Sequence, residues 1–429
     1  MPHDRKRHRV SVEESIVRAV LLNGELASLL YSYQEGIYWD FFPLLKECKR
    51  IKERGCIPQG DHLLLILPDR FHAAYRIKTM PSSDLCMDTT HVHLLPLHLA
   101  IFEGNLHFVQ KWYKCHPDHI TPRALDCATK YAHIQLVKWL ANKTTGTHDA
   151  VDFAAGIGHM ELLQFLFSKG IQGSFRAMDE AAANGHLEIL WHLHTSTTLN
   201  PTRNAMDRAA GNGHLTIVRF LDEHRLEGCT VEAMNSAAFN GHLDVVKYLH
   251  THRDEGCSVT AMDWAAGQGY LKVVQWLDAN RHEGCSKIAL DVAATNGHFD
   301  VVKWLHQHRK EGCTTAAMDG AAGNGHLDIV EYLHHNRKEG CTTAAMDDAA
   351  KNGYLNVVHW LQGNRMEGAT EMGICETRDR GFDDIAEYMR KHCRTDMACD
   401  SSECEVNDDS DEDDTYIRYY DNDDDDVLR

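Results

Sequence analysis

Residues 317–333 read Ala-Met-Asp-Gly-Ala-Ala-Gly-Asn-Gly-His-Leu-Asp-Ile-Val-Glu-Tyr-Leu, and this stretch decides the fold. The alanines and the methionine between 317 and 322 recur at helical spacing and predict a first helix with a narrow apolar face. Asn324-Gly325 breaks this helix, because glycine adopts the left-handed conformation that other residues resist. The aliphatic residues from Leu327 to Leu333 then predict the buried side of a second helix.

The same phrase recurs along most of the chain at intervals of 28 residues. Its turn glycine is found at Gly185, Gly213, Gly241, Gly269, Gly297, Gly325 and Gly353. Looser copies lie around Gly104, Ala132, Gly158 and Gly381. A single pair of short helices cannot bury its apolar face alone, so neighbouring pairs must stack to build a continuous core. We therefore expect one elongated helical array.

The repeated unit resembles the ankyrin repeat, whose usual phrase is Thr-Pro-Leu-His-x-Ala-Ala followed by Gly-His-Leu and an aliphatic second helix. Residues 96–100, Pro-Leu-His-Leu-Ala, keep this phrase nearly intact, whereas later copies have Ala-Met-Asp in place of Pro-Leu-His. The period is about five residues shorter than the family's, and the missing residues fall where the family has a β-hairpin finger. The resemblance implies an all-α, ankyrin-like helical solenoid of about eleven helix-turn-helix repeats, with these fingers shortened or absent.

The chain is expected to have three parts. Residues 1–94 would form an N-terminal helical cap or degenerate repeats, residues 95–391 the solenoid, and residues 392–429 an acidic disordered tail. Within the solenoid, Asn204-x-x-Asp207 and Thr260-x-x-Asp263 predict helix-start caps, in which an oxygen acceptor is followed three residues later by an acid.

Most of the net charge belongs to the tail. Of the total of −19, about −12 falls between Asp400 and Arg429, which hold 14 acidic and two basic residues. Too little apolar material remains there to offset the entropy lost on ordering. Ser402 and Ser410 each precede an acid by three residues, a spacing that acid-directed kinases favour, so both are candidate phosphorylation sites.

Cysteine and histidine each recur at one position of successive repeats, and we call such a set of residues a column. These two columns suggest a disulfide or metal site but are better explained by packing. The cysteines are Cys229, Cys257, Cys285, Cys313 and Cys341. Stacked helices lie about 8–10 Å apart, too far for a disulfide, and one cysteine per repeat cannot supply the four ligands of zinc. A histidine follows most turn glycines, but tyrosine replaces it at Tyr270 and Tyr354, which a metal ligand would not allow. We expect no metal site and no cofactor.

Two further columns run through the second helices. The aromatic one comprises Trp139, Phe165, Phe220, Tyr248, Trp276, Trp304, Tyr332, Trp360 and Tyr388, and it is broken once, where Trp191 stands one position early beside His192. No basic groove accompanies it, so no nucleic acid is expected. The other column has an arginine in each repeat, from Arg225 to Arg365, with a glutamate two residues later. These pairs predict a surface ion-pair ladder of small energetic value.

The positions that vary between repeats are the candidates for recognition. By the resemblance, first-helix positions line the concave face that contacts partners. Large aromatic residues and arginine are also the commonest interface anchors. The candidate partner-binding residues are Glu180, Arg208, Ser236, Phe239, Trp264, Val292, Asp348 and Lys351.

No standard catalytic signature occurs, so the sequence favours a non-enzymatic protein–protein interaction scaffold. The alternative is a substrate adaptor, whose N-terminal region docks a larger complex such as a ubiquitin ligase. The expected partner is another protein, and the acidic tail would suit a basic one. No apolar stretch is long enough to span a membrane. Fourteen cysteines without a secretion signal favour reduced thiols in an intracellular protein of the cytoplasm or nucleus. We expect this protein to be a monomer.

Overall fold

A computed structural model of the chain describes residues 93–393 and, before them, residues 33–34, 37–38, 44–46, 48–49, 51, 57–59, 62–67, 76 and 79–87. The chain divides into two compact units, Met1–Ala317 and Met318–Arg429, each described by itself below. Among the described helices, none is both long and apolar enough to cross a lipid bilayer.

The described residues before 87 contain short antiparallel strands. β1 (Tyr33–Gln34) pairs with β2 (Ile37–Tyr38), and β4 (His62–Ile66) pairs with both β3 (Ile57–Gln59) and β5 (Thr79–Pro81), after which comes the 3-10 helix η2 (Ser82–Leu85). These strands were not predicted, whereas residues 44–46, 48–49 and 51 are helical, so the helical cap or degenerate repeats for residues 1–94 stay a prediction.

From residue 95 onward the fold is a succession of helix pairs. In the first unit they are α5 (Leu95–Phe102), α6 (Leu106–Cys115), α7 (Pro122–Lys130), α8 (Ile134–Leu140), α9 (His148–Gly156), α10 (Met160–Ser168), α11 (Phe175–Ala183), α12 (Leu187–Ser196), α13 (Arg203–Gly211), α14 (Leu215–His224), α15 (Val231–Phe239), α16 (Leu243–His252), α17 (Val259–Gly267), α18 (Leu271–Asn280), α19 (Ile288–Thr295) and α20 (Phe299–His308), with the 3-10 helix η4 (Pro117–His119) after α6. The division between the units falls within α21 (Ala316–Gly323). The second unit continues with α22 (Leu327–Asn336), α23 (Thr343–Lys351), α24 (Leu355–Asn364), α25 (Glu371–Asp379) and α26 (Asp383–His392).

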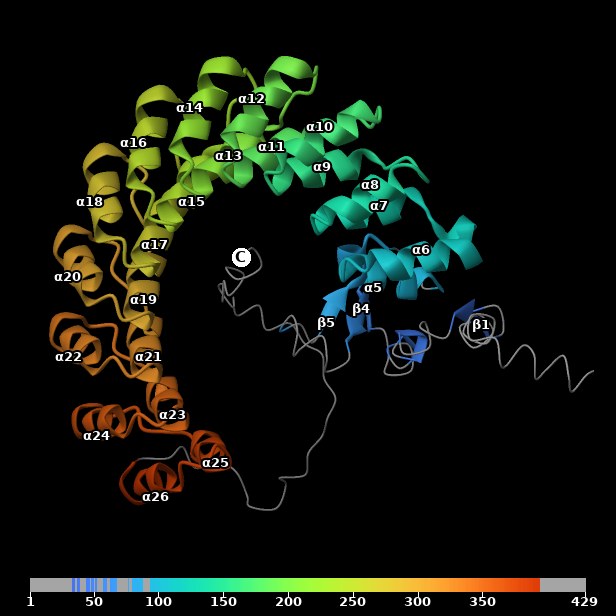
Figure 1. Cartoon of the computed structure of the whole chain (residues 1–429). Coiled ribbons are helices and arrows are strands. Elements are labelled where there is room, and N and C mark those ends of the chain that lie inside the picture. Colours follow the sequence, from blue (N-terminus) through green and yellow to red (C-terminus); the bar gives the residue numbers. More distant parts are fainter. Residues whose placement is uncertain are drawn as a thin grey trace, which may run out of the picture. The chain divides into compact units, whose positions relative to one another are not determined.

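These elements confirm the predicted fold class. The helices α5 to α26 make eleven consecutive pairs, and no strand lies between residues 93 and 393, so the β-hairpin fingers are absent there. In the first unit the first helices of successive pairs pack against one another in one row, and the second helices form another row beside it (Figure 1).

The pair α17 and α18 shows how the repeated phrase produces this packing. Ala261, Ala265 and Ala266 are fully or almost fully buried, so the neighbouring first helices can approach closely. On α18, the aliphatic residues from Val273 to Leu277 close the core from the other side. Gly269 joins the two helices with a φ of +77°, in the left-handed region that favours glycine.

The N-caps of these first helices lie two residues before the predicted positions. The N-caps are Thr202 and Ser258, so the assignment of caps to Asn204 and Thr260 is wrong. The acids of those motifs instead bond to the following repeat. Asp207, for example, accepts bonds at 2.8 Å from both the backbone N–H and the hydroxyl of Thr230.

This two-bond contact recurs through the array, and we call it the aspartate ladder. The other carboxylates and their partners are Asp126–Thr147, Asp152–Ser174, Asp179–Thr202, Asp263–Ser286 and Asp291–Thr314 in the first unit, and Asp319–Thr342 and Asp347–Thr370 in the second. Each carboxylate satisfies the donors at the start of the next first helix, which would otherwise lack partners. The ladder thus gives a physical reason for Ala-Met-Asp in place of Pro-Leu-His.

One rung of the ladder is neutral. Asn235 accepts a bond from the Ser258 backbone N–H at 3.0 Å and donates its side-chain amide to the Ser258 hydroxyl at 3.0 Å. The contact therefore needs two hydrogen-bonding atoms at the right spacing and does not need a charge.

The rings that follow the turn glycines pack across the repeats, as predicted. The ring of His298 lies against Gly269, and that of Tyr270 lies in the same way against Gly241. Some of the histidines also bond to the preceding repeat, as His186 Nε2 does to the Gly156 carbonyl oxygen at 3.0 Å. Tyrosine can replace histidine because the contact requires a flat ring.

The arginine column differs from its prediction as a surface ladder. Arg253 pairs with Glu255 at 2.6 Å and reaches back to Asp222 of the preceding repeat at 3.1 Å, with only about a quarter of its side chain exposed (26%). The hydrogen bond from Arg253 is the main cause that lowers the pKa of Glu255 to about 2. Arg309 likewise pairs with its own Glu311 at 2.5 Å and with Asp278 of the preceding repeat at 2.7 Å, so both arginines join successive repeats.

The cysteines of the column pack between repeats, as predicted. Cys229, Cys285, Cys313 and Cys341 are buried, and Cys257 is half-buried. Burial raises the pKa of Cys229 to about 12 and those of Cys257, Cys285 and Cys341 to about 11. Such thiols hold little thiolate at neutral pH, so they are poor nucleophiles.

Candidate partner-binding face

The eight candidate residues lie on first helices. In the first unit, Glu180 lies on α11, Arg208 on α13, Ser236 and Phe239 on α15, Trp264 on α17 and Val292 on α19. We call these six residues the first-helix strip. Arg208 is exposed and the other five are half-buried, so all of them retain some accessible surface. Asp348 and Lys351 lie on α23 of the second unit.

The charged end of the strip is a paired contact between two repeats. The Arg208 guanidinium donates to both carboxylate oxygens of Glu180, at 2.7 and 3.1 Å. The side chain of Arg208 remains 47% exposed, so water screens the pair and its contribution to stability is small. A partner that forms hydrogen bonds with either group would therefore lower the stability of the fold only slightly.

The middle of the strip is aromatic. The rings of Phe239 and Trp264 meet edge to face, with centroids 5.7 Å apart and an interplanar angle of 75°. They come from neighbouring first helices, α15 and α17, and both side chains are half-buried. Their contact fixes the orientation of two large apolar surfaces that remain partly open to water.

Small residues at the ends of the first helices leave room for the strip. A Cβ atom added to Gly211 would lie 3.0 Å from Cβ of Ser236, and one added to Gly267 would lie 2.7 Å from Cγ1 of Val292. Each of these strip residues therefore covers the glycine backbone of the preceding repeat. Part of the variation between repeats therefore reflects complementary sizes: a glycine in one repeat makes room for a larger side chain in the next. The sequence alone did not reveal this relation.

In the second unit the candidate residues form a charged cluster. Lys351 bonds to Asp348 at 2.8 Å and to Glu376 of the next repeat at 3.2 Å. A Cβ atom on Gly323 would lie 2.9 Å from Cβ of Asp348, so the same glycine arrangement is found here. The structure thus brings Asp348 and Lys351 together and adds Glu376, which the sequence analysis did not identify.

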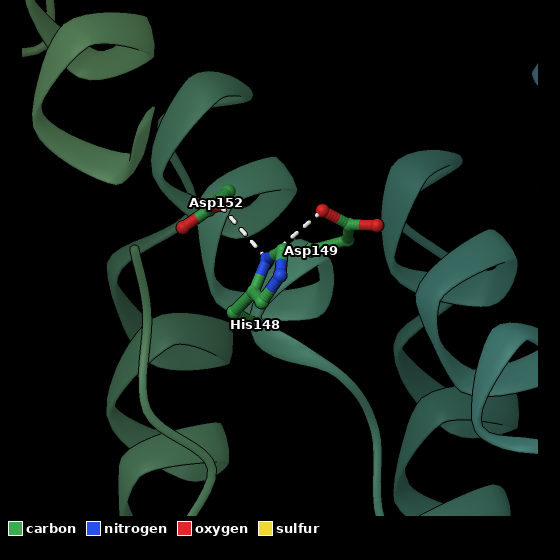
Figure 2. Close-up of side chains that lie close together, drawn as sticks. All are labelled: His148, Asp149 and Asp152. Atoms are coloured by element: carbon green, nitrogen blue, oxygen red, sulfur yellow. Dashed lines mark ion pairs between the residues drawn. The ribbon is translucent and has the colours of Figure 1, made fainter. Parts of the chain in front are cut away.

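A second cluster missed by the sequence analysis lies at the start of α9 (Figure 2). His148 Nδ1 is 3.1 Å from an oxygen of Asp149 and 3.5 Å from one of Asp152, so all three could offer metal ligands. The spacing His-Asp-x-x-Asp in a first helical turn could have revealed it. However, both oxygens of Asp152 already accept bonds from Ser174, and a structural zinc site needs four ligands. We interpret the cluster as an extension of the aspartate ladder and assign it no metal.

Ser402 and Ser410, the candidate phosphorylation sites, lie outside the described residues.

Comparison with known families agrees with the repeat geometry. A family model described as ankyrin repeats (3 copies) matches residues 178–263, 208–290 and 290–370. These matches include the whole first-helix strip and both candidate residues of α23. No curated protein sequence matches the chain.

Proposed function

The chain is an ankyrin-repeat protein, and we propose that it is a non-enzymatic scaffold that binds a partner protein through the first-helix strip. Ankyrin repeats generally mediate protein–protein interaction. The observation that carries the proposal is the edge-to-face pair of Phe239 and Trp264, which holds two large, partly exposed rings on adjacent first helices. Aromatic residues with fixed orientation lose little entropy on binding and are frequent interface anchors.

The neighbours of this pair support an interface with an apolar centre and a polar end. Val292 extends the apolar surface on one side, and Ser236 and the Arg208–Glu180 pair offer hydrogen bonds on the other. Protein interfaces commonly combine a desolvated centre with a charged rim in this way. In this proposal the chain acts as an intracellular monomer, and Asp348 and Lys351 form a separate polar contact in the second unit.

The adaptor role remains a more specific version of the same proposal. It requires residues 1–94 to bind a second protein while the strip holds a client. Binding of a second partner to the full-length chain, unaffected by changes in the strip, would favour it over a simple scaffold.

We expect Phe239→Ala combined with Trp264→Ala to weaken partner capture by about tenfold or more, because the anchor rings are removed. Helicity should stay unchanged, and the melting temperature should fall only slightly, since both side chains are only half-buried. The measurement is quantitative mass spectrometry of proteins captured by the full-length variant and wild type, with circular dichroism of both.

Leu226→Ala is the matched control, because Leu226 is a fully exposed apolar residue outside the strip. It should leave both capture and melting unchanged. Unfolding of the double variant would show that the rings belong to the core. Unchanged capture by a folded double variant would refute the strip as the binding face.

A further inference from the structure

The second helices carry one residue that departs from every other repeat. Trp191 occupies the fifth position of α12, and its side chain is 50% exposed. The corresponding residues of the other second helices are all polar: Gln110, Lys138, Gln164, Arg219, Lys247, Gln275, Lys303, Glu331, His359 and Glu387. The aromatic position that follows holds His192 in this repeat. An exposed tryptophan at this position indicates a contact surface, because every other repeat has a polar residue there.

Trp191 lines a groove of about 570 Å³ between α12 and α14. These two helices follow one another in the row of second helices (Figure 1). Its indole meets the buried Phe220 ring edge to face at 5.6 Å and the His224 ring at 5.7 Å. These rings give the groove an aromatic wall that is fixed on two helices, and Leu187 adds an exposed aliphatic edge.

The polar atoms around this wall are mostly hydrogen-bond acceptors. Glu188 and Glu223 line the groove, and neither carboxylate has an ion pair with another described residue. His224 donates through Nδ1 to the Phe220 carbonyl oxygen at 3.0 Å, so Nε2 of the neutral ring is left as an acceptor. The one lining cation, Arg219, has its guanidinium 5.4 Å from the centre of the Tyr248 ring, in the next repeat.

From this combination we propose that the groove between α12 and α14 binds an arginine side chain in an exposed segment of a partner protein. A guanidinium is planar, stacks on aromatic faces and carries five donors, which suits an indole wall flanked by two carboxylates and an imidazole acceptor. Leu187 would contact an apolar residue next to that arginine. The site lies on the second helices and is distinct from the first-helix strip.

A peptide library displayed on phage tests the proposal with the full-length chain as bait. Peptides are selected on wild type and counter-selected on Trp191→Gln, a change that installs the residue found at Gln164 and Gln275. The variant should keep its melting temperature, because the position is polar elsewhere. We expect the selected peptides to contain arginine beside an apolar residue. Synthetic copies should bind Trp191→Gln about tenfold or more weakly than wild type.

Two further measurements define the chemistry of the site. Replacing the peptide arginine by citrulline, which keeps the shape and removes the charge, should also weaken binding about tenfold. Glu188→Gln with Glu223→Gln should reduce affinity at low salt and lose its effect at high salt. The Phe239→Ala and Trp264→Ala variant should bind these peptides normally, so failure of the strip proposal would be distinguishable. Selection of no Trp191-dependent peptide, or of peptides without arginine, would overturn the assignment.

Discussion

Gly269→Ala is expected to lower the free energy of unfolding by about 3 kcal/mol. Two causes combine at this turn. Gly269 has a φ of +77°, where an alanine is strained by about 1–2 kcal/mol. Its Cβ would also lie 2.5 Å from Nδ1 of His298 and 2.8 Å from Cε1, so the ring must leave its position against the turn. Urea unfolding of the full-length chain, followed by circular dichroism, measures the effect.

Gly170→Ala separates the two causes. Gly170 has nearly the same φ, +79°, but a Cβ atom added there would have no neighbour within 4 Å. We therefore expect this control to be destabilised by about 1–2 kcal/mol, from backbone strain alone. Equal effects of the two substitutions would show that the ring contact contributes nothing to the stacking of repeats.

The contact between Gly269 and His298 also shows what the sequence could predict. The period, the alanine face and the turn glycine are local patterns, and they were sufficient for the helix pairs and for a packing role of the rings. The identity of the contacting glycine was not predicted, because the ring lies against the turn of the preceding repeat and not its own. The strands before residue 87 were missed because that region lacks a period.

The role of the ladder aspartates was predicted incorrectly for a related reason. Asp207 and Asp263 fit a capping-box spacing within their own helix, but their partners are Thr230 and Ser286, 23 residues later. The signal was present, since every ladder carboxylate from Asp179 onward is followed at that distance by a serine or threonine. Within the candidate face, the residues of the strip were identified correctly as first-helix positions. Their pairing depends on side-chain sizes in neighbouring repeats, which no single repeat specifies.

The ladder gives the array an unusual dependence on pH. Burial raises the pKa of Asp126 from 3.8 to about 6, although the bonds from Thr147 partly oppose this shift. Burial raises the pKa of further ladder carboxylates in the same direction: Asp179, Asp207, Asp263, Asp319 and Asp347. A carboxyl whose pKa is higher in the folded state binds its proton more tightly there. Its contribution to stability is therefore largest below pH 3.8 and is lost as the pH rises through about 6.

Asp126→Asn should remove this dependence at one rung. Between pH 7.5 and pH 5, the free energy of unfolding of wild type should rise by about 1.5 kcal/mol relative to the variant, because only wild type takes up a proton at this position. Comparing the two proteins at each pH cancels the titration of all other groups. Urea unfolding at both pH values provides the measurement.

Asn235→Asp is the reciprocal test, since it places a carboxyl on the rung that is naturally neutral. Asn235 is buried and bonds to Ser258 in the same geometry, so the new carboxyl should also have a raised pKa. This variant should gain stability relative to wild type as the pH falls from 7.5 to 5, the opposite of the change seen for Asp126→Asn. If both differences stay constant with pH, the hydrogen bonds outweigh burial and the carboxylates stay charged in the folded array. A ladder stabilised by its charge would instead lose stability only as the pH falls below about 4, where the unfolded carboxyl takes up its proton, and the neutral rung would then be its weakest point.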